Sequence, residues 1–328
     1  MHSNFISPAG LLRGADARRA VAAGLALPLG PGLAHSQHLR LGPGTRELLP
    51  LGAAPAYPDP GRPLVMGIVN ATPDSFSDGG RFLGVAGIEQ AERLVEAGAD
   101  MLDIGGESTR PGSAEVPAAE EIDRVCPVIE GARRLGVPIS VDTRKAPVMK
   151  AALAAGADII NDVSALGFDA EAAPFLATRD CPVVLMHSRA IPATMQQAPH
   201  YDDLVFEVLA ELEAACERAV AAGIARSRLI LDPGIGFAKT AAHNAALIDE
   251  MQALHALRLP ILLGTSRKSF IGHFAGGASP AGRLAGSLAT ALAGIDRGAA
   301  ILRVHDVAET AQAVKLWAAV NATPPQHD

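Results

Sequence analysis

Four side chains that accept hydrogen bonds stand directly after short apolar runs, namely Asn70, Asp142, Asn161 and Asp232. Runs of this length are typical of strands buried on both faces, and the loops that leave parallel strands carry the chemistry of α/β enzymes. A single Asp in such a place often only caps the next helix. Acceptors on several strands at one edge instead favour a ligand with adjacent N–H donors, such as a 2-amino-4-oxo heterocycle.

Basic side chains on the last two strands would balance these carboxylates. Lys268 follows the seventh apolar run, and Arg303 lies inside the eighth, just before His305. The planar guanidinium of Arg303 can stack on a flat ring or hold an anion. Because the first and last strands of a barrel are neighbours, we expect Asn70, Arg303 and His305 to form a phosphate pocket.

The sequence contains no motif of several other common kinds of active site. We find no Ser-His-Asp nucleophile elbow, no P-loop and no Cys/His metal cluster. The only divalent ion that the sequence indicates is Mg²⁺, held mainly by a substrate phosphate. Asn70 would be its one protein ligand, through the amide oxygen.

Composition and charge exclude several classes of partner. The chain has 328 residues, of which 49% are apolar, and a formal net charge of −7. No basic stripe suited to nucleic acid is visible, and the apolar stretch over residues 20–27 is too short to span a membrane. The cysteines, Cys126, Cys181 and Cys216, are far apart, which favours a reduced, cytoplasmic protein.

A regular alternation of apolar runs and helical stretches begins at Leu64. Eight strand–helix units with right-handed crossovers predict an α/β fold, the (β/α)8 TIM barrel. A doubly wound sheet is the alternative, but no G-x-G-x-x-G follows the first run. The expected strands cover residues 64–69, 101–104, 139–141, 159–160, 183–186, 229–231, 261–263 and 301–304. The expected helices cover residues 87–97, 118–135, 145–155, 202–222, 244–257 and 281–297.

The first part of the chain differs in composition from the rest. We expect residues 1–60 to form an N-terminal extension that is partly ordered at most, and residues 61–328 to form the barrel. The arginines Arg13, Arg18 and Arg19 on an Ala-rich stretch suit either a transit peptide or a short amphipathic helix. We favour a dispensable extension that packs against the barrel.

Five motifs beyond this extension resemble the dihydropteroate synthase family. The resemblance runs from Leu64 to near Trp317. The motifs are Asn70-Ala-Thr-Pro-Asp-Ser-Phe-Ser-Asp-Gly-Gly80, Asp103-Ile-Gly-Gly-Glu-Ser-Thr-Arg-Pro-Gly112, Asp232-Pro-Gly-Ile-Gly-Phe237, Gly264-Thr-Ser-Arg-Lys-Ser269 and Arg303-Val-His-Asp306.

The resemblance implies a homodimeric enzyme of folate biosynthesis. Such enzymes condense 7,8-dihydropterin-6-ylmethyl diphosphate with 4-aminobenzoate and release 7,8-dihydropteroate and diphosphate, with Mg²⁺ as the cofactor. Sulfonamides compete for the 4-aminobenzoate site of the family. The implied partners are therefore small-molecule substrates and a second copy of the chain, with neither nucleic acid nor a membrane.

The matched positions also imply a role for each site residue. The implied catalytic residues are Asp142, Lys268 and Arg303. The pterin-binding residues are Asp142, Asn161, Met186, Asp232, Lys268 and Arg303. The diphosphate pocket is Asn70, Arg303 and His305, with Asn70 on the metal. The residues around 4-aminobenzoate are Thr109, Arg110, Pro111, Phe237, Ser266 and Lys268.

The residues and the resemblance agree on an SN1-like mechanism. The diphosphate leaves to give a cationic pterin methylene, which the amine then attacks, so no protein nucleophile is required. Asp142 would stabilise the developing charge. The alternatives are a pterin-binding methyltransferase module, and a paralogue that binds a pterin without turning it over.

The sequence departs from the family pattern at two loops. Ala238 stands where the family usually has Gly, and an Ala would be strained if that backbone needs a positive φ. Ser188-Arg189-Ala190 replaces a loop that usually carries Gly after the His. Both departures concern loop geometry and leave the matched catalytic positions unchanged.

Overall fold

The alternating strands and helices close into a barrel in the computed structural model, which describes residues 4–52, 57, 61–71, 83–108, 113–189 and 199–322. The barrel strands are β5 (Leu64–Asn70), β6 (Met101–Gly105), β7 (Ile139–Asp142), β8 (Ile159–Asp162), β9 (Val183–Met186), β10 (Leu229–Asp232), β11 (Leu262–Leu263) and β12 (Ile301–Val304). The α-helices of the barrel are α2 (Leu83–Glu96), α3 (Ala118–Ala132), α4 (Ala146–Ala155), α5 (Ala172–Ala177), α6 (Leu204–Ala221), α7 (Ala241–Asp249), α8 (Ser269–Phe274), α9 (Leu284–Ile295) and α10 (Val307–Ala322). Short 3-10 helices are η2 (Arg133–Leu135), η3 (Arg226–Arg228), η4 (Met251–Leu257) and η5 (Pro280–Arg283).

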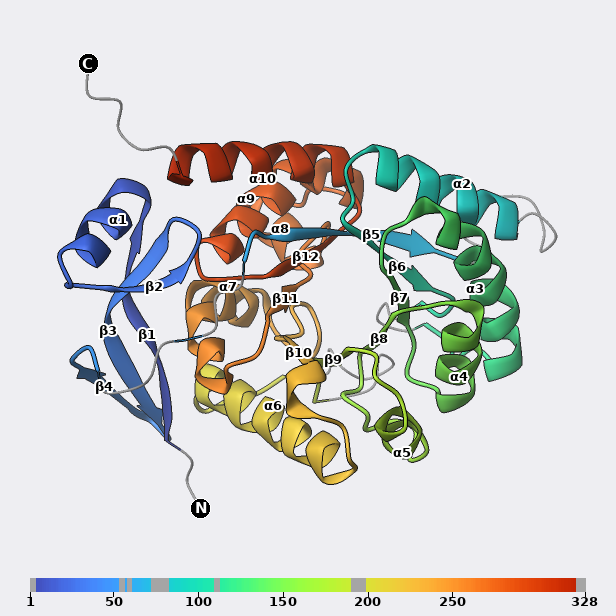
Figure 1. Cartoon of the computed structure of the whole chain (residues 1–328), viewed down its shortest axis with the longest axis horizontal. Helices are drawn as coiled ribbons and strands as arrows, with labels where there is room; N and C mark the ends of the chain where they lie inside the picture. Colours follow the sequence, from blue (N-terminus) through green and yellow to red (C-terminus); the bar gives the residue numbers. More distant parts are fainter. Residues whose placement is uncertain are drawn as a thin grey trace.

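The strands form one parallel sheet in the order β10-β9-β8-β7-β6-β5-β12-β11. A parallel bridge between Leu231 and Ile261 joins its two ends, and Figure 1 shows the resulting ring of strands with helices around it. The (β/α)8 barrel predicted from the sequence is therefore confirmed. The sequence did not predict α5, α8 and α10.

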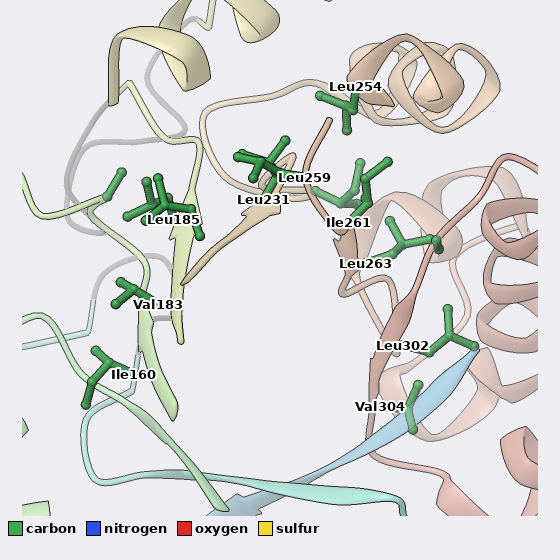
Figure 2. Packing of buried hydrophobic residues seen from close by; sticks show 14 of the residues in the cluster. Ile160, Val183, Leu185, Leu231, Leu254, Leu259, Ile261, Leu263, Leu302 and Val304 are labelled. Atoms are coloured by element: carbon green, nitrogen blue, oxygen red, sulfur yellow. The ribbon is translucent and has the colours of Figure 1, made fainter. Parts of the chain in front are cut away.

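Side chains on each strand alternate between the inside of the barrel and the surrounding helices. The outward residues belong to the main apolar core, and Figure 2 shows Val183, Leu185, Leu263 and Leu302 among them. The inward residues nearest the amino ends of the strands form a separate apolar layer. This inner layer consists of Met66, Met101, Ile159, Val184, Ile230, Leu262, Ala300 and Ile301, with Leu64 packed against it.

Two Gly-Ala-Asp turns tie neighbouring strands together at their amino ends. Asp100 precedes β6, and its Oδ2 accepts a hydrogen bond from the backbone N–H of Val65 at 2.8 Å. Asp158 precedes β8 and accepts from the N–H of Ile139 at 2.9 Å. These carboxylates satisfy donors at the start of the adjacent strand, so their role is structural.

The N-terminal extension contains more regular structure than the sequence predicts. Its helix is α1 (Gly14–Ala22), and its antiparallel strands are β1 (Phe5–Arg13), β2 (Leu27–Gly30), β3 (Leu33–Gly42) and β4 (Thr45–Leu49). Strand β3 pairs with the three others. Strand β1 packs against η4 and helix α1 packs against α10, on one flank of the barrel (Figure 1).

Apolar contacts explain this order, because Phe5, Leu29, Leu33 and Leu41 are buried in the same core as the barrel helices. Phe5 lies with its ring centroid 5.8 Å from that of Phe206 on α6. An extension that shares the core of the barrel folds with it. The sequence predicted only partial order for this segment. Pro8 and Gly10 lie inside β1, and both residue types weaken the sequence pattern of a strand.

Among the described residues, no helix is both long and apolar enough to cross a membrane.

Candidate active site

A layer of mostly polar side chains lies directly above the inner apolar layer. Each member follows a residue of the apolar layer by two positions on its own strand, so it points to the same side of the sheet. These members are Asp103, Asn161, Met186, Asp232 and Arg303. Strand periodicity thus brings side chains from five strands together at the carboxyl end of the barrel, where TIM-barrel enzymes keep their active sites.

The Arg303 guanidinium connects opposite sides of this layer. Its Nε donates to Asp103 Oδ2 at 2.6 Å, and its Nη2 donates to Asp142 Oδ2 at 2.7 Å. Burial opposes the charge, but the carboxylates of Asp103 and Asp142 raise the pKa of Arg303 above its ordinary value. Arg303 is therefore a permanent cation inside the barrel.

Asp103 is a member of the site that sequence reasoning missed as a functional residue. It is fully buried and also accepts from Asn161 Nδ2 at 3.1 Å. The sequence does contain a signal for Asp103. It stands two positions after the apolar Met101 on the same strand, so the two side chains point to the same face of the sheet. Asp103 differs from the predicted site residues Asn70, Asp142, Asn161 and Asp232 because it lies inside its apolar run and does not follow it.

Two buried acceptors in this layer have no hydrogen-bond partner among the described residues, Asp103 Oδ1 and Asn161 Oδ1. An unsatisfied buried acceptor costs free energy. Their position beside Asp142 and Asp232 suits a ligand that brings several N–H donors on one edge.

The remaining ionisable groups of the layer are buried and mutually coupled. Burial raises the pKa of Asp142, with Arg303 opposing the shift and Asp103 adding to it. Burial also raises the pKa of Asp232, whose Oδ1 accepts from the N–H of Gly234 at 2.7 Å. Burial and the neighbouring Arg303 lower the pKa of Lys268 to about 8. These shifts let the ionisable groups of the site change their protonation state near neutral pH when a ligand binds.

Aromatic and apolar groups form one wall of the site. Met186, Phe237 and Ala238 make a small buried cluster. Lys268 Nζ lies 4.3 Å from the centroid of the Phe237 ring, a cation–π distance. This wall offers a flat ring a surface beside a cation.

Asn70, Ser266 and His305 lie near the carboxyl ends of β5, β11 and β12. His305 Nδ1 is 3.0 Å from Ser266 Oγ, and burial together with Arg303 lowers the pKa of His305 to about 4. Strands β5 and β12 are neighbours, with Met66 opposite Arg303. The structure thus brings together the strands that carry Asn70, Arg303 and His305, as the predicted phosphate pocket requires. The guanidinium of Arg303 itself contacts the carboxylates of Asp103 on β6 and Asp142 on β7.

Thr109, Arg110, Pro111 and Ala190 lie outside the described residues. The carboxylate of Asp162, which also follows a strand, accepts from the N–H groups of Ser164 and Leu166 and from the Ser164 hydroxyl. Asp162 therefore stabilises a turn.

Ala238 has a positive φ, the backbone conformation that would strain an Ala where the family usually has Gly. Its φ is +47°, in the left-handed region that an L-residue enters at a cost of about 1–2 kcal/mol. Its carbonyl accepts from the Tyr201 hydroxyl at 3.0 Å. The strain expected from an Ala at this position is therefore present.

Comparisons with known proteins agree with this geometry. The profile of the family described as pterin binding enzyme matches residues 66–305. The dihydropteroate synthase of Neisseria meningitidis serogroup B is 50% identical over 266 residues, which cover 79% of this chain and 93% of that protein.

Solved structures show the same similarity in three dimensions. The Yersinia pestis dihydropteroate synthase in a sulfonamide drug complex has a TM-score of 0.76 and 46% identity, over 80% of this chain and 95% of that one. The Xanthomonas albilineans dihydropteroate synthase in complex with 7,8-dihydropteroate has a TM-score of 0.73 and 48% identity, again over 80% and 95%. By profile, identity and fold, the chain belongs to the pterin binding enzyme family and, within it, to the dihydropteroate synthases.

Proposed function

We propose that this chain condenses 7,8-dihydropterin-6-ylmethyl diphosphate with 4-aminobenzoate to give 7,8-dihydropteroate and diphosphate, a step of folate biosynthesis. The observation that carries the proposal is the buried polar layer of the barrel, with its unpartnered acceptors and the Arg303 cation. The membership of the chain among the dihydropteroate synthases supports the same reaction.

The pterin would lie on the polar layer. Its 2-amino-4-oxo edge carries adjacent N–H donors, which Asp142, Asn161 and Asp232 would accept. Lys268 would donate to an acceptor of the ring, while Met186 and Arg303 would pack against its faces. Asp103 joins this set through its contacts with Arg303 and Asn161.

The diphosphate would bind above the pterin, among Asn70, Arg303 and His305. The described residues contain no group of three or more His, Cys, Asp or Glu side chains that could hold a metal ion alone. A Mg²⁺ ion carried mainly by the diphosphate fits this donor set, because Mg²⁺ prefers oxygen ligands and Asn70 offers one amide oxygen. When bound, the ion would stabilise the charge of the leaving group.

The 4-aminobenzoate would lie between Phe237, Ser266 and Lys268. The ammonium of Lys268 beside the Phe237 ring supports a site for an aromatic carboxylate. By family resemblance, Thr109, Arg110 and Pro111 would complete it.

The reaction would proceed in an SN1-like manner. The C–O bond to the diphosphate breaks with its electron pair leaving on oxygen, and the cationic methylene that remains accepts the amine lone pair. The new ammonium nitrogen then releases one proton to water, which gives the neutral secondary amine of the product. Asp142 would face this centre, where its negative charge would stabilise the cation more than the neutral substrate. No protein nucleophile takes part.

The test is to incubate the purified chain with the pterin diphosphate, 4-aminobenzoate and Mg²⁺, and to measure dihydropteroate and diphosphate. We expect both products only when all components are present, and their loss when a chelator removes Mg²⁺. Pterin binding without products would indicate a non-catalytic paralogue. Methyl transfer to a corrinoid protein would indicate the methyltransferase alternative.

We further propose a cytoplasmic homodimer. Leu316 and Val320, one turn apart on α10, are 66% and 69% exposed, and a second copy would cover such a pair. The three cysteines are free thiols, as the reducing cytoplasm requires. Sedimentation equilibrium at micromolar concentration tests the dimer, and a monomer there would contradict it.

A further inference from the structure

Lys239 is a buried cation that the proposed reaction does not use. Its exposed fraction is 2%, and its Nζ lies 2.9 Å from His187 Nδ1. The same Nζ donates to the carbonyls of Gly234 and Phe237, both at 3.1 Å. Burial lowers the pKa of Lys239 to about 7, while Asp232 and Glu211 favour the charged form. The three acceptors match the three protons of an ammonium group.

His187 fixes the direction of this ammonium group. Because its Nδ1 accepts from Lys239, its proton must be on Nε2, which lies 3.0 Å from Glu211 Oε2. Burial lowers the pKa of His187 to about 4, so the ring is neutral. A chain of hydrogen bonds thus runs from the partly exposed Glu211 to the loop that follows β10.

That loop contains a turn closed by a hydrogen bond from the N–H of Phe237 to the carbonyl of Gly234 at 3.1 Å, and Lys239 adds to this bond. Gly234, Gly236 and Ala238 all have positive φ, at +68°, +84° and +47°. A Cβ at Gly234 would lie 1.9 Å from the carbonyl oxygen of His187, so the backbone passes as close as a glycine allows. Lys239 binds the carbonyls at both ends of the turn, and Asn244 Oδ1 accepts from the N–H of Gly236 at 2.7 Å.

We infer that Lys239 is a positioning residue that holds the Gly234–Phe237 turn so that the Phe237 ring faces Lys268 and orients 4-aminobenzoate. The ammonium binds the carbonyl of Phe237, and the ring of the same residue lies 4.3 Å from Lys268 Nζ. The backbone of Asp232 is held by β10, although its carboxylate also accepts from the N–H of Gly234 in the same turn. We therefore expect the pterin to depend less on Lys239 than 4-aminobenzoate does. The inference rests on the proposed place of 4-aminobenzoate beside Phe237.

The test is the variant Lys239→Met, which keeps an unbranched side chain one heavy atom shorter and removes the ammonium donors. We expect the KM for 4-aminobenzoate to rise about tenfold or more, while the KM for the pterin diphosphate stays within about twofold. The matched control is Lys150→Met, on the exposed side of α4, which should change neither constant. If Lys239 only stabilised the fold, Lys239→Met would lower Tm and leave both KM values unchanged, which would overturn the inference.

A parallel variant separates this inference from the proposed site. Phe237→Ala should raise the KM for 4-aminobenzoate, and if it does not, the proposed site is wrong. If Phe237→Ala raises that constant and a folded Lys239→Met does not, the site stands and the role of Lys239 is wrong.

Should Lys239→Met fail to fold, Glu211→Gln tests the same chain of hydrogen bonds from its partly exposed end. Its side chain is 41% exposed and also pairs with Arg189. Because Gln keeps the size of the side chain and can still accept hydrogen bonds, we expect this variant to fold. We expect a rise of about two- to fivefold in the KM for 4-aminobenzoate alone. An unchanged constant in this variant would contradict the inference.

Discussion

The charged side chains inside the barrel are grouped around the guanidinium of Arg303. When all are ionised, the carboxylates of Asp103, Asp142 and Asp232 exceed the cations Lys268 and Arg303 by one negative charge. A buried cluster of this sign favours a reaction that passes through a cation. Truncation of one member would leave its partner buried and unpaired, which costs more than the contact itself contributed.

At the residue scale, the first prediction concerns Asp142. Asp142→Asn keeps the shape of the side chain and removes its negative charge, so we expect a loss of about 2–4 kcal/mol of transition-state stabilisation. Steady-state kcat and kcat/KM measure it. The matched control is Asp162→Asn, on the neighbouring strand, which should lower stability through its turn and leave kcat unchanged. Wild-type turnover in Asp142→Asn would contradict the proposed role.

The second prediction at this scale concerns Arg303. Arg303→Lys keeps the charge but cannot bridge Asp103 and Asp142 as the planar fork does. We expect the affinity for inorganic pyrophosphate to fall by about tenfold or more, measured by titration calorimetry. Arg297→Lys, at the end of α9, serves as the control. Equal pyrophosphate affinity in both variants would refute the shared pocket.

At the scale of elements, strand periodicity explains what could be predicted from the sequence. The apolar runs match β5 to β12 closely, because buried parallel strands consist of such runs. The extension was underestimated, since its strands carry polar residues such as His35 and His38 and gain order from contacts with the barrel. Lys239 was missed because its partner His187 is far away in the sequence, and no local pattern reports such a contact.

A prediction at this scale concerns the loop after β10. Ala238→Gly removes the Cβ from a left-handed position, so we expect the free energy of unfolding to rise by about 0.5–1 kcal/mol. Gly236→Ala, in the same loop at φ +84°, should lower it by about 1–2 kcal/mol. Urea unfolding measures both changes. A less stable Ala238→Gly would show that the buried methyl group outweighs the backbone strain.

At the scale of the molecule, the extension is joined to the barrel through a cluster of aromatic and imidazole rings. His35 lies 5.2 Å from His38 and 5.3 Å from Tyr57 between ring centroids, and Tyr57 lies 6.4 Å from His255 on η4. The guanidinium carbon of Arg258 lies over the Tyr57 ring, 5.3 Å from its centroid. Burial lowers the pKa of both His35 and His255 to about 4, so the interface requires neutral imidazoles.

This cluster predicts a pH dependence of stability. The folded pKa of His35 lies below its unfolded value, so the unfolded chain binds more protons between pH 6.5 and about 4. Stability should therefore fall as the pH falls, by about 2 kcal/mol from His35 alone between pH 7 and 5. Urea unfolding at the two pH values measures this. His35→Phe should reduce the difference by that amount, and an undiminished pH dependence in the variant would contradict the assignment.

The inner apolar layer beneath the polar site has a kinetic consequence. Met66, Met101, Ile159 and Val184 fill the barrel from the amino ends of the strands, so side chains close that route. Every ligand must then arrive and depart through the same opening. In the proposed arrangement, the pterin occupies the deeper position and 4-aminobenzoate the shallower one. The proposed arrangement therefore predicts a compulsory order of addition, in which 4-aminobenzoate bound first would be a dead-end complex.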